Sequence, residues 1–259
     1  MATQKFYYLV HFQYLGFRYH GWQKQPGLLT VEHMIEKTLR WILGSEKFKI
    51  LAASRTDARV SANHSAFELF LERPIPPDTL LADLNLNLPP DIRILQVEET
   101  DRQFSILNAP RTKEYTYLFS FGEKCHPFAA ALVSAFPEHL DIGLMQQGAR
   151  LFQGRHNFIQ YCTQPKPGTT VEREIIESRI EENVLYQASF FPEKTWVYIV
   201  RARGFLRYQV RLIMGQLRCL GRGEINLQDI QKSLTGADRS PLRHIAPASG
   251  LILNAIEFE

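Results

Sequence analysis

Cysteine is scarce in this sequence of 259 residues, which contains only Cys125, Cys162 and Cys219 and no CxxC pair. Such spacing argues against a disulfide scaffold or a zinc ribbon and fits a reducing compartment. No apolar run reaches the ~18 residues that a membrane-spanning helix requires. The polar residues 1–5 lead into a strand pattern rather than a secretory signal. We therefore expect a cytoplasmic protein that has no membrane partner.

Glycine-rich phosphate-binding patterns are also missing, since neither G-x-x-x-x-G-K-[ST] nor G-x-G-x-x-G occurs. The eight histidines show no HxxxH or HxH spacing of the kind that binds a metal. The G-x-S-x-G sequence of many serine hydrolases is also absent. We expect no metal, no nucleotide cofactor and no organic cofactor. The net charge of only +3 means that a nucleic-acid interface would depend on where the basic residues lie.

What the sequence does contain is an apolar fraction of 45%, enough for a packed core, with strand and helix patterns mixed along the chain. This mixture favours an α+β fold of two similar halves, 1–108 and 109–259, joined near 105–112. Alternation and composition predict strands, and helical spacing predicts helices. The expected strands are 6–14, 48–54, 65–72, 92–97, 114–121, 172–180, 185–191, 195–202 and 251–258, and the expected helices are 30–43, 80–86, 141–152 and 206–220.

The most informative segment is the polar stretch 54–62, SRTDARVSA, which lies between two apolar strand patterns. It places two arginines, Arg55 and Arg59, on either side of one carboxylate, Asp57. Loops between rigid strands often display reactive groups. Taken alone, an Arg-Thr-Asp triplet is more often a turn or a surface ion pair.

This segment does not stand alone, because four others accompany it in a fixed order. They are YLGFRYHGWQKQ at 14–25, KEYTY at 113–117, FLRYQVRLIMG at 205–215 and PASGL at 247–251. Together with RTDA at 55–58, followed by Val60 and Ala62, they resemble the motifs of the TruA family of tRNA pseudouridine synthases. The resemblance spans residues 14–251, nearly the whole chain.

The resemblance implies a fold, an activity and partners. The implied fold is the pseudouridine synthase fold, two α+β halves with mainly antiparallel sheets flanked by helices and a basic cleft between them, with Asp57 at its floor. The implied activity is the isomerisation of uridine to pseudouridine in RNA. The implied partners are tRNA, bound at its anticodon stem-loop, and a second copy of the chain in a homodimer.

The chemistry of this isomerisation suits the residues. The N1–C1′ bond breaks and a C5–C1′ bond forms, without redox change or phosphate energy. A carboxylate can attack covalently or stabilise positive charge that develops at C1′. Asp57 matches the essential aspartate of the family. Tyr115 matches the tyrosine expected to stack on the target base and to assist removal of the C5 proton. Tyr117 shares its strand face and is the expected packing residue.

Arg211 completes the expected catalytic set. On the 206–220 helix, Arg207 and Arg211 border an apolar stripe, so we expect at least one of them to be partly buried. A partly buried arginine requires a carboxylate partner. We therefore predict that Arg211 pairs with Asp57 and keeps it ionised. Arg218 and Arg222 are expected on a solvated basic face.

RNA binding requires phosphate contacts and extrusion of the target base. Two basic groups are available: Arg201, Arg203, Arg207 and Arg211 form one, and Lys24, Arg55 and Arg59 form the other. Arg55 matches the family arginine that helps to hold the flipped nucleotide. His20, Trp22 and Gln23 resemble part of the RNA-contacting segment, although Trp22 fits the core equally well.

The chain departs from the family pattern at four positions. Ser54 and Arg59 stand where glycine is usual, Ser61 where histidine is usual, and Leu15 where aspartate is usual. If position 59 requires a positive φ, a side chain costs ~1–2 kcal/mol and the path of the loop would differ. We interpret the chain as a divergent member that keeps the chemistry and has altered RNA selection.

Two alternatives remain open from the sequence. One is a non-catalytic RNA-binding protein, which would bind tRNA and leave its uridines unchanged. The other is a nucleoside or glycoside hydrolase, which would need a second acidic group close to Asp57.

Overall fold

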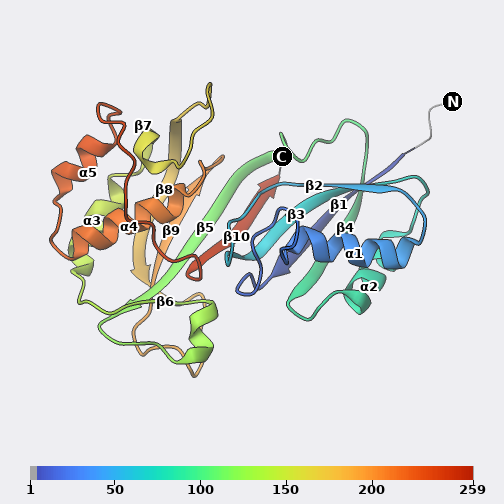
Figure 1. Ribbon diagram of the computed structural model, residues 1–259, viewed down its shortest axis with the longest axis horizontal. Coiled ribbons are helices and arrows are strands. Elements are labelled where there is room, and N and C mark those ends of the chain that lie inside the picture. Colours follow the sequence, from blue (N-terminus) through green and yellow to red (C-terminus); the bar gives the residue numbers. More distant parts are fainter. Residues whose placement is uncertain (1–4, 259) are drawn as a thin grey trace. The chain divides into compact units, whose positions relative to one another are not determined.

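The computed structural model describes residues 5–258, which fall into two compact units (Figure 1). The first unit runs to Arg111 and also includes the stretch from Leu253 onwards, and the second unit is Thr112–Ile252. The boundary after Arg111 lies inside the expected joint at 105–112. The units differ from the predicted halves 1–108 and 109–259 in that the end of the last strand belongs to the first unit.

The sheet of the first unit is built around β1 (Phe6–Tyr14). Antiparallel neighbours flank it, β3 (Ser61–Leu71) on one side and β4 (Ile92–Thr100) on the other. β2 (Phe48–Ala52) pairs with β3, also antiparallel. The two strands that flank the polar segment 54–60 are therefore hydrogen-bonded to each other, and Ala52 lies opposite Phe67, so the segment begins beside the middle of β3.

Two helices accompany this sheet, and local sequence explains where each begins. The first, α1 (Val31–Leu43), starts after Thr30, whose hydroxyl accepts a 3.3 Å hydrogen bond from the backbone N–H of His33. Its buried apolar residues repeat every four positions, as a helix with one face in the core requires. The second, α2 (Pro77–Asn87), begins three residues earlier than the expected 80–86, because a proline is well tolerated in the first turn.

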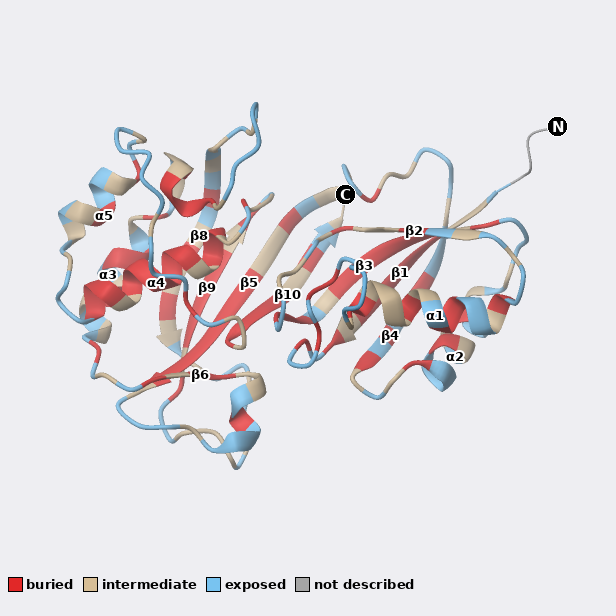
Figure 2. Ribbon diagram, in the orientation of Figure 1, coloured by how far each residue is buried: buried red, intermediate tan, exposed pale blue. Residues whose placement is uncertain are grey.

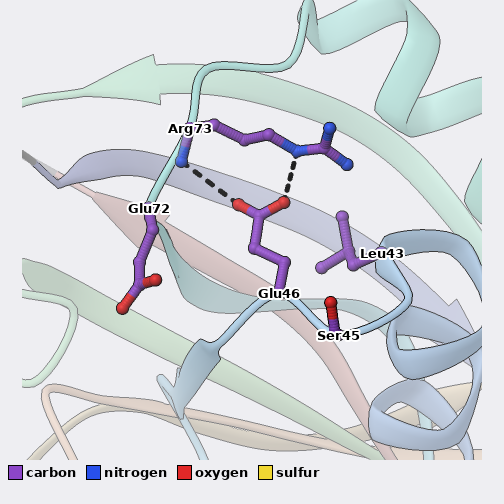
Figure 3. Close-up of a pocket in the computed structure, with 5 residues that line it drawn as sticks. All are labelled: Leu43, Ser45, Glu46, Glu72 and Arg73. Carbon is purple, nitrogen blue, oxygen red and sulfur yellow. Dashed lines mark hydrogen bonds and ion pairs between the residues drawn. The ribbon is translucent and has the colours of Figure 1, made fainter.

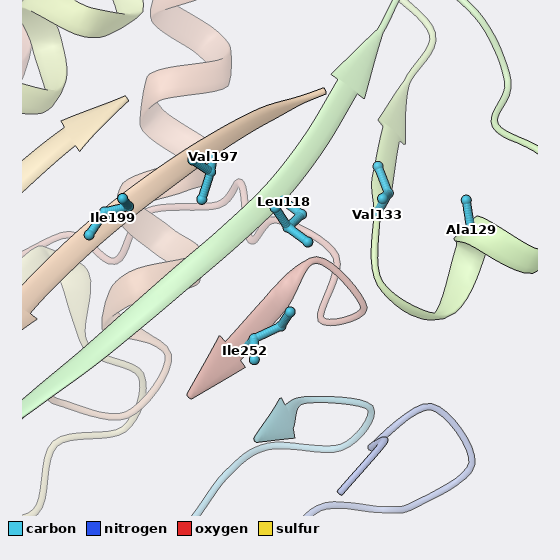
Figure 4. Close-up of a cluster of buried hydrophobic side chains, with 6 residues drawn as sticks. All are labelled: Leu118, Ala129, Val133, Val197, Ile199 and Ile252. Atoms are coloured by element: carbon cyan, nitrogen blue, oxygen red, sulfur yellow. The ribbon is translucent and has the colours of Figure 1, made fainter. Parts of the chain in front are cut away.

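The second unit contributes strands to the mainly antiparallel sheet in the order β5 (Pro110–Phe121), β9 (Trp196–Ala202), β8 (Glu172–Glu182) and β7 (Gly154–Asn157). A short strand, β6 (Ser134–Phe136), pairs with β5 in parallel. Buried strands appear as continuous red stretches in Figure 2. One core cluster joins this sheet to neighbouring segments (Figure 4); it contains Leu118, Ala129, Val133, Val197, Ile199 and Ile252.

The helices of the second unit are α3 (Ile142–Arg150), α4 (Gln209–Gly221) and α5 (Leu227–Ser233), with short 3₁₀ turns at Pro127–Ala131 and Ile159–Tyr161. Asp141 caps α3 through a 2.8 Å bond from the N–H of Leu144. The expected helix 206–220 begins later, at Gln209, because Tyr208 has φ 63° and a left-handed residue cannot continue a right-handed helix. The last strand, β10 (Leu251–Phe258), has the expected bounds.

One predicted strand was wrong. Residues 185–191 form turns, because the side chain of Asn183 takes the backbone groups that a strand ladder would use. Its Oδ1 accepts from the N–H groups of Leu185 and Tyr186, both at 3.1 Å, and its Nδ2 donates to Tyr186 O at 2.7 Å. Asparagine commonly closes turns in this way. The strands β6 and β7, the helix α5 and both 3₁₀ turns were not expected.

A histidine pair, of which His11 is buried and His64 is half-buried, lies on the sheet of the first unit. His11 Nδ1 and His64 Nε2, from β1 and β3, are 2.9 Å apart, and His11 Nε2 is 3.7 Å from Glu98 Oε1. Burial lowers the pKa of both histidines below the usual 6.5, and the neighbouring His64 lowers the pKa of His11 further. The unfolded chain therefore binds more protons than the folded chain just below pH 6.5, so stability is complete above that pH and is lost as pH falls.

We expect the thermal midpoint of the wild type to fall between pH 7.5 and pH 5.5, and His64→Asn to reduce this dependence. Circular dichroism melts of both proteins across that range measure it. An equal midpoint at the two pH values in the wild type would contradict the inference.

In the part of the chain that the structure describes, no helix combines the length and the apolar character needed to cross a membrane.

Candidate active site

The loop that carries Asp57 runs from Ala53 to Val60, between β2 and β3. Its entry is fixed by Ala53, whose N–H donates to Ala66 O at 3.0 Å. Its exit is a tight turn, in which the N–H of Val60 donates to Asp57 O at 3.2 Å. Asp57 is half-buried, whereas Arg55 and Arg59 are exposed. The loop thus presents one carboxylate between two solvent-facing cations, as the sequence predicts.

A second segment, residues 14–22, is hydrogen-bonded to this loop. The N–H of Trp22 donates to Thr56 O at 3.2 Å, and the N–H of Arg59 donates to Tyr19 O at 2.9 Å. The hydroxyls of Tyr14 and Thr56 are 2.7 Å apart. These bonds lie on both sides of Asp57 in the sequence, so its backbone is fixed in position. The structure therefore brings together two of the five motifs.

Tyr14 and Ser61 are site-supporting residues that the sequence analysis did not identify. Ser61 is buried, and its hydroxyl accepts a 2.9 Å bond from the N–H of Gly16. The serine that replaces the usual histidine therefore has a structural partner within the same pair of segments. The only sequence signal was its position inside the matched motif.

Two glycines allow this close contact. A Cβ at Gly16 would lie 2.0 Å from Val60 O, and a Cβ at Gly21 would lie 2.6 Å from Thr56 O. Gly21 also has φ 88°, a conformation that glycine adopts without steric penalty. The N–H groups that open α1, on Val31 and Glu32, donate to Gly21 O and Trp22 O. The segment is thus tied to the helix at one end and to the Asp57 loop along its length.

Arg59 adopts φ 66°, so this position does use the left-handed conformation for which glycine is suited. The turn is kept despite the side chain, at a strain of ~1–2 kcal/mol. The bond from the Arg59 N–H to Tyr19 O helps to offset it. The guanidinium carbon lies 5.6 Å from the centre of the Phe17 ring.

Tyr115 lies in the second unit, on β5, with 8% of its surface exposed. Its ring makes an edge-on contact with Phe205 at 5.2 Å between centroids. Tyr117 is completely buried, and its hydroxyl lies 3.0 Å from Ser134 Oγ and 2.9 Å from Pro247 O. Burial raises the pKa of Tyr117. Tyr117 is thus the packing residue of the pair, as predicted.

Arg211, on α4, is half-buried, so at least one of the two arginines is partly buried, as predicted. Its Nε donates to Ala246 O at 2.8 Å, and the N–H of Ala246 donates to Arg211 O at 3.1 Å. The guanidinium carbon also lies 4.9 Å from the ring centre of Tyr208. A Cβ at Gly215 would lie 1.8 Å from His244 O, which shows how closely α4 approaches this stretch. The 205–215 motif and the stretch that leads to PASGL therefore contact each other within the second unit.

The predicted solvated basic face of the helix is correct for Arg222, which is exposed, and wrong for Arg218, which is half-buried. Arg218 pairs with Glu138 and lies 4.7 Å above the centre of the Phe136 ring. Hydrogen bonding to Arg218 lowers the pKa of Glu138. Arg222 pairs with Glu224 at 2.8 Å. Each arginine is therefore paired with a carboxylate. Helical spacing could not predict these pairs, because Glu138 and Glu224 lie outside the helix.

The remaining residues proposed for RNA contact differ in what surrounds them. Trp22 belongs to the core, with 2% of its surface exposed. Lys24 is exposed but pairs with Glu36 at 2.5 Å. Arg207 precedes α4 rather than lying on it, and its guanidinium carbon is 5.4 Å from the Tyr208 ring. The side chains of these predicted contact residues are exposed to solvent: Gln23, Lys24, Arg55, Arg59, Arg203 and Arg207.

Elsewhere in the first unit, a pocket is lined by Leu43, Ser45, Glu46, Glu72 and Arg73 (Figure 3). Glu46 accepts bonds there from the backbone N–H and the Nε of Arg73. Because Arg73 is already paired with Glu46 and none of the predicted site residues lines the pocket, it is no candidate for catalysis. Over residues 5–258, no cluster of three or more His, Cys, Asp or Glu side chains could hold a metal ion.

Comparisons with known proteins identify the family of this chain. A family model described as tRNA pseudouridine synthase matches residues 149–259. The chain is 32% identical over 252 residues to tRNA pseudouridine synthase A of Solibacter usitatus, covering 96% of this chain and 98% of the relative. It is 33% identical to the protein of the same name from Dictyoglomus thermophilum (96% and 98% covered) and 31% identical to that of Listeria innocua (97% and 99% covered).

A solved structure of an H/ACA RNP bound to a substrate RNA containing 2′-deoxyuridine also matches, with a TM-score of 0.32 and 17% identity over 80% of this chain and 44% of that chain. So weak a likeness adds nothing to the assignment. The α+β fold with its mainly antiparallel sheet, the family model and the relatives that match nearly the whole chain together define a pseudouridine synthase. Within that class, the chain belongs to the tRNA pseudouridine synthase A family.

Proposed function

We propose that this protein isomerises uridine to pseudouridine in tRNA, with Asp57 as the catalytic carboxylate. The observation that carries the proposal is the fixed position of Asp57: backbone bonds from Trp22 to Thr56 and from Arg59 to Tyr19 bracket it. A carboxylate that acts on a bound nucleotide must be held in a productive geometry, because small displacements reduce rates strongly. Family membership supports the reaction, and the hydrogen-bonded loop supports the choice of Asp57.

The reaction requires the N1–C1′ bond to break, the base to turn and a C5–C1′ bond to form, after which C5 loses its proton and N1 gains one. Asp57 assists by covalent attack or by stabilising charge at C1′. Tyr115 stacks on the base and assists removal of the C5 proton. Arg211 pairs with Asp57 and keeps it ionised. No nucleotide, metal or organic cofactor takes part in these steps.

The substrate is held by phosphate contacts and by extrusion of the target uridine. Arg55, next to the catalytic loop, holds the flipped nucleotide. Exposed side chains bind the surrounding RNA: Gln23, Lys24, Arg59, Arg203 and Arg207. The ion pair between Lys24 and Glu36 is no obstacle, because exposed pairs contribute only ~0–1 kcal/mol. We further propose that the enzyme is a cytoplasmic homodimer and that it acts on the anticodon stem-loop.

The test is to incubate the purified protein with unmodified tRNA transcripts and to map pseudouridine by carbodiimide labelling and primer extension. We expect reaction at one or more uridines of the anticodon stem-loop. Salt-sensitive binding without any pseudouridine in several tRNAs would instead favour a non-catalytic RNA-binding protein. Release of free uracil would favour a hydrolase, which the loop disfavours because its only acidic residue is Asp57.

A further inference from the structure

Phe17 and Arg59 form an exposed pair beside the catalytic loop. Phe17 is 41% exposed, although a phenylalanine ring is ordinarily buried, and Arg59 is also exposed. The guanidinium carbon of Arg59 lies 5.6 Å from the centre of the Phe17 ring, within the range of a cation–π interaction. The pair sits on the two segments that hold Asp57, one residue on each.

The charge of Arg59 is available to a ligand, in contrast to that of its neighbour Arg18. Arg18 donates through Nε and one terminal nitrogen to both carboxylate oxygens of Asp91, so its charge is compensated. Among residues 5–258, no carboxylate forms an ion pair with Arg59. The pair therefore offers a free guanidinium and an aromatic face at one place.

The backbone of Arg59 supports a role for this side chain. In the described part of the chain, only Arg59, Gln164 and Tyr208 are non-glycine residues with positive φ. Arg59 lies two residues after Asp57, in a turn that glycine would form without strain. A strained residue kept beside a reactive group suggests that its side chain serves the site.

We propose that Phe17 and Arg59 form a subsite for one RNA nucleotide that flanks the target uridine. The Arg59 guanidinium donates paired hydrogen bonds to its phosphate, and the Phe17 ring stacks on its base. This inference rests on the proposed function, since it places the subsite beside the catalytic carboxylate. It assigns to Phe17 a role in substrate binding and gives a reason for the arginine at position 59.

The test measures binding of an unmodified tRNA transcript, as a function of salt, to wild type, Arg59→Ala, Arg59→Gly and Phe17→Ala. Both Arg59 variants should bind roughly 10-fold more weakly, because a charge-assisted contact is lost, and the slope of log affinity against log salt should fall by about 0.7–0.9. Phe17→Ala should also weaken binding, on the order of 10-fold, but should leave the salt slope unchanged. Lys37→Ala, which removes an exposed cation on α1, is the matched control and should behave as wild type.

Thermal melts separate the strain from the binding role. Arg59→Gly should melt ~2–8 °C above Arg59→Ala, because only glycine relieves the positive φ, yet both should bind equally weakly. Wild-type affinity and slope in the Arg59 and Phe17 variants would overturn the subsite, even if the wild type makes pseudouridine. Absence of pseudouridine from the wild type would instead reject the proposed function, and the binding measurements would still report on the subsite.

Discussion

Asp57→Asn is expected to reduce pseudouridine formation in tRNA by at least ~10³-fold while leaving tRNA affinity unchanged. Asparagine has the shape of aspartate, and the turn bond from the Val60 N–H to the carbonyl oxygen of residue 57 does not involve the side chain. The amide, however, carries no negative charge, so it can neither attack the nucleotide nor stabilise charge at C1′. The measurement is a single-turnover assay with saturating enzyme, beside filter binding of the same tRNA.

The matched control is Asp78→Asn, an equal change of charge at an exposed position in the first turn of α2. It should retain wild-type activity, which shows that a general change of surface charge has no effect. Activity near the wild-type level in Asp57→Asn would exclude this residue from the chemistry. Thermal melts of both variants report whether the fold is intact. If Asp57→Asn is folded but loses both activity and tRNA binding, Asp57 is an RNA contact instead.

The sequence predicted the loop of Asp57 well because its signals are local. Strand composition on both sides and a polar stretch between them identify a connection, and Thr30 marks the start of α1 by its own hydrogen bond. The start of β3 was predicted less well: the strand begins at Ser61 rather than at residue 65, and Ala62 already pairs with Tyr14 of β1. Polarity alone made these residues resemble a loop.

Features that depend on distant partners could not be predicted in this way. Glu138 compensates Arg218 across 80 positions of sequence, and helical periodicity gives no sign of it. The later start of α4 depends on the left-handed Tyr208, a residue type that does not mark such a conformation. The contacts of Gly16 and Gly21 with the Asp57 loop join segments about 40 positions apart. The motifs can therefore be recognised in the sequence, whereas the contacts between them are seen only in the structure.

Those contacts predict that Gly16→Ala destabilises the first unit and displaces the catalytic loop. The new Cβ would lie 2.0 Å from Val60 O and 2.4 Å from Val60 C, and both are backbone atoms that cannot rotate away. Relief requires a shift of the 14–22 segment or of the loop, which would also break the bond from the Gly16 N–H to Ser61. We expect a loss of about 3 kcal/mol and a thermal midpoint roughly 6–12 °C lower. Activity at a temperature where the variant is folded should fall ~10²-fold, because Asp57 loses its position.

Gly27→Ala provides the comparison from the same stretch of chain. Gly27 has φ 72°, but a Cβ there would meet no atom within 4 Å. Its substitution therefore introduces left-handed strain of ~1–2 kcal/mol without a clash, and activity should be kept. If Gly16→Ala were no more harmful than Gly27→Ala, the contact between the two segments would not hold the loop in place. If Gly16→Ala loses activity at a temperature where it is fully folded and still binds tRNA, the packing of this glycine determines the position of Asp57.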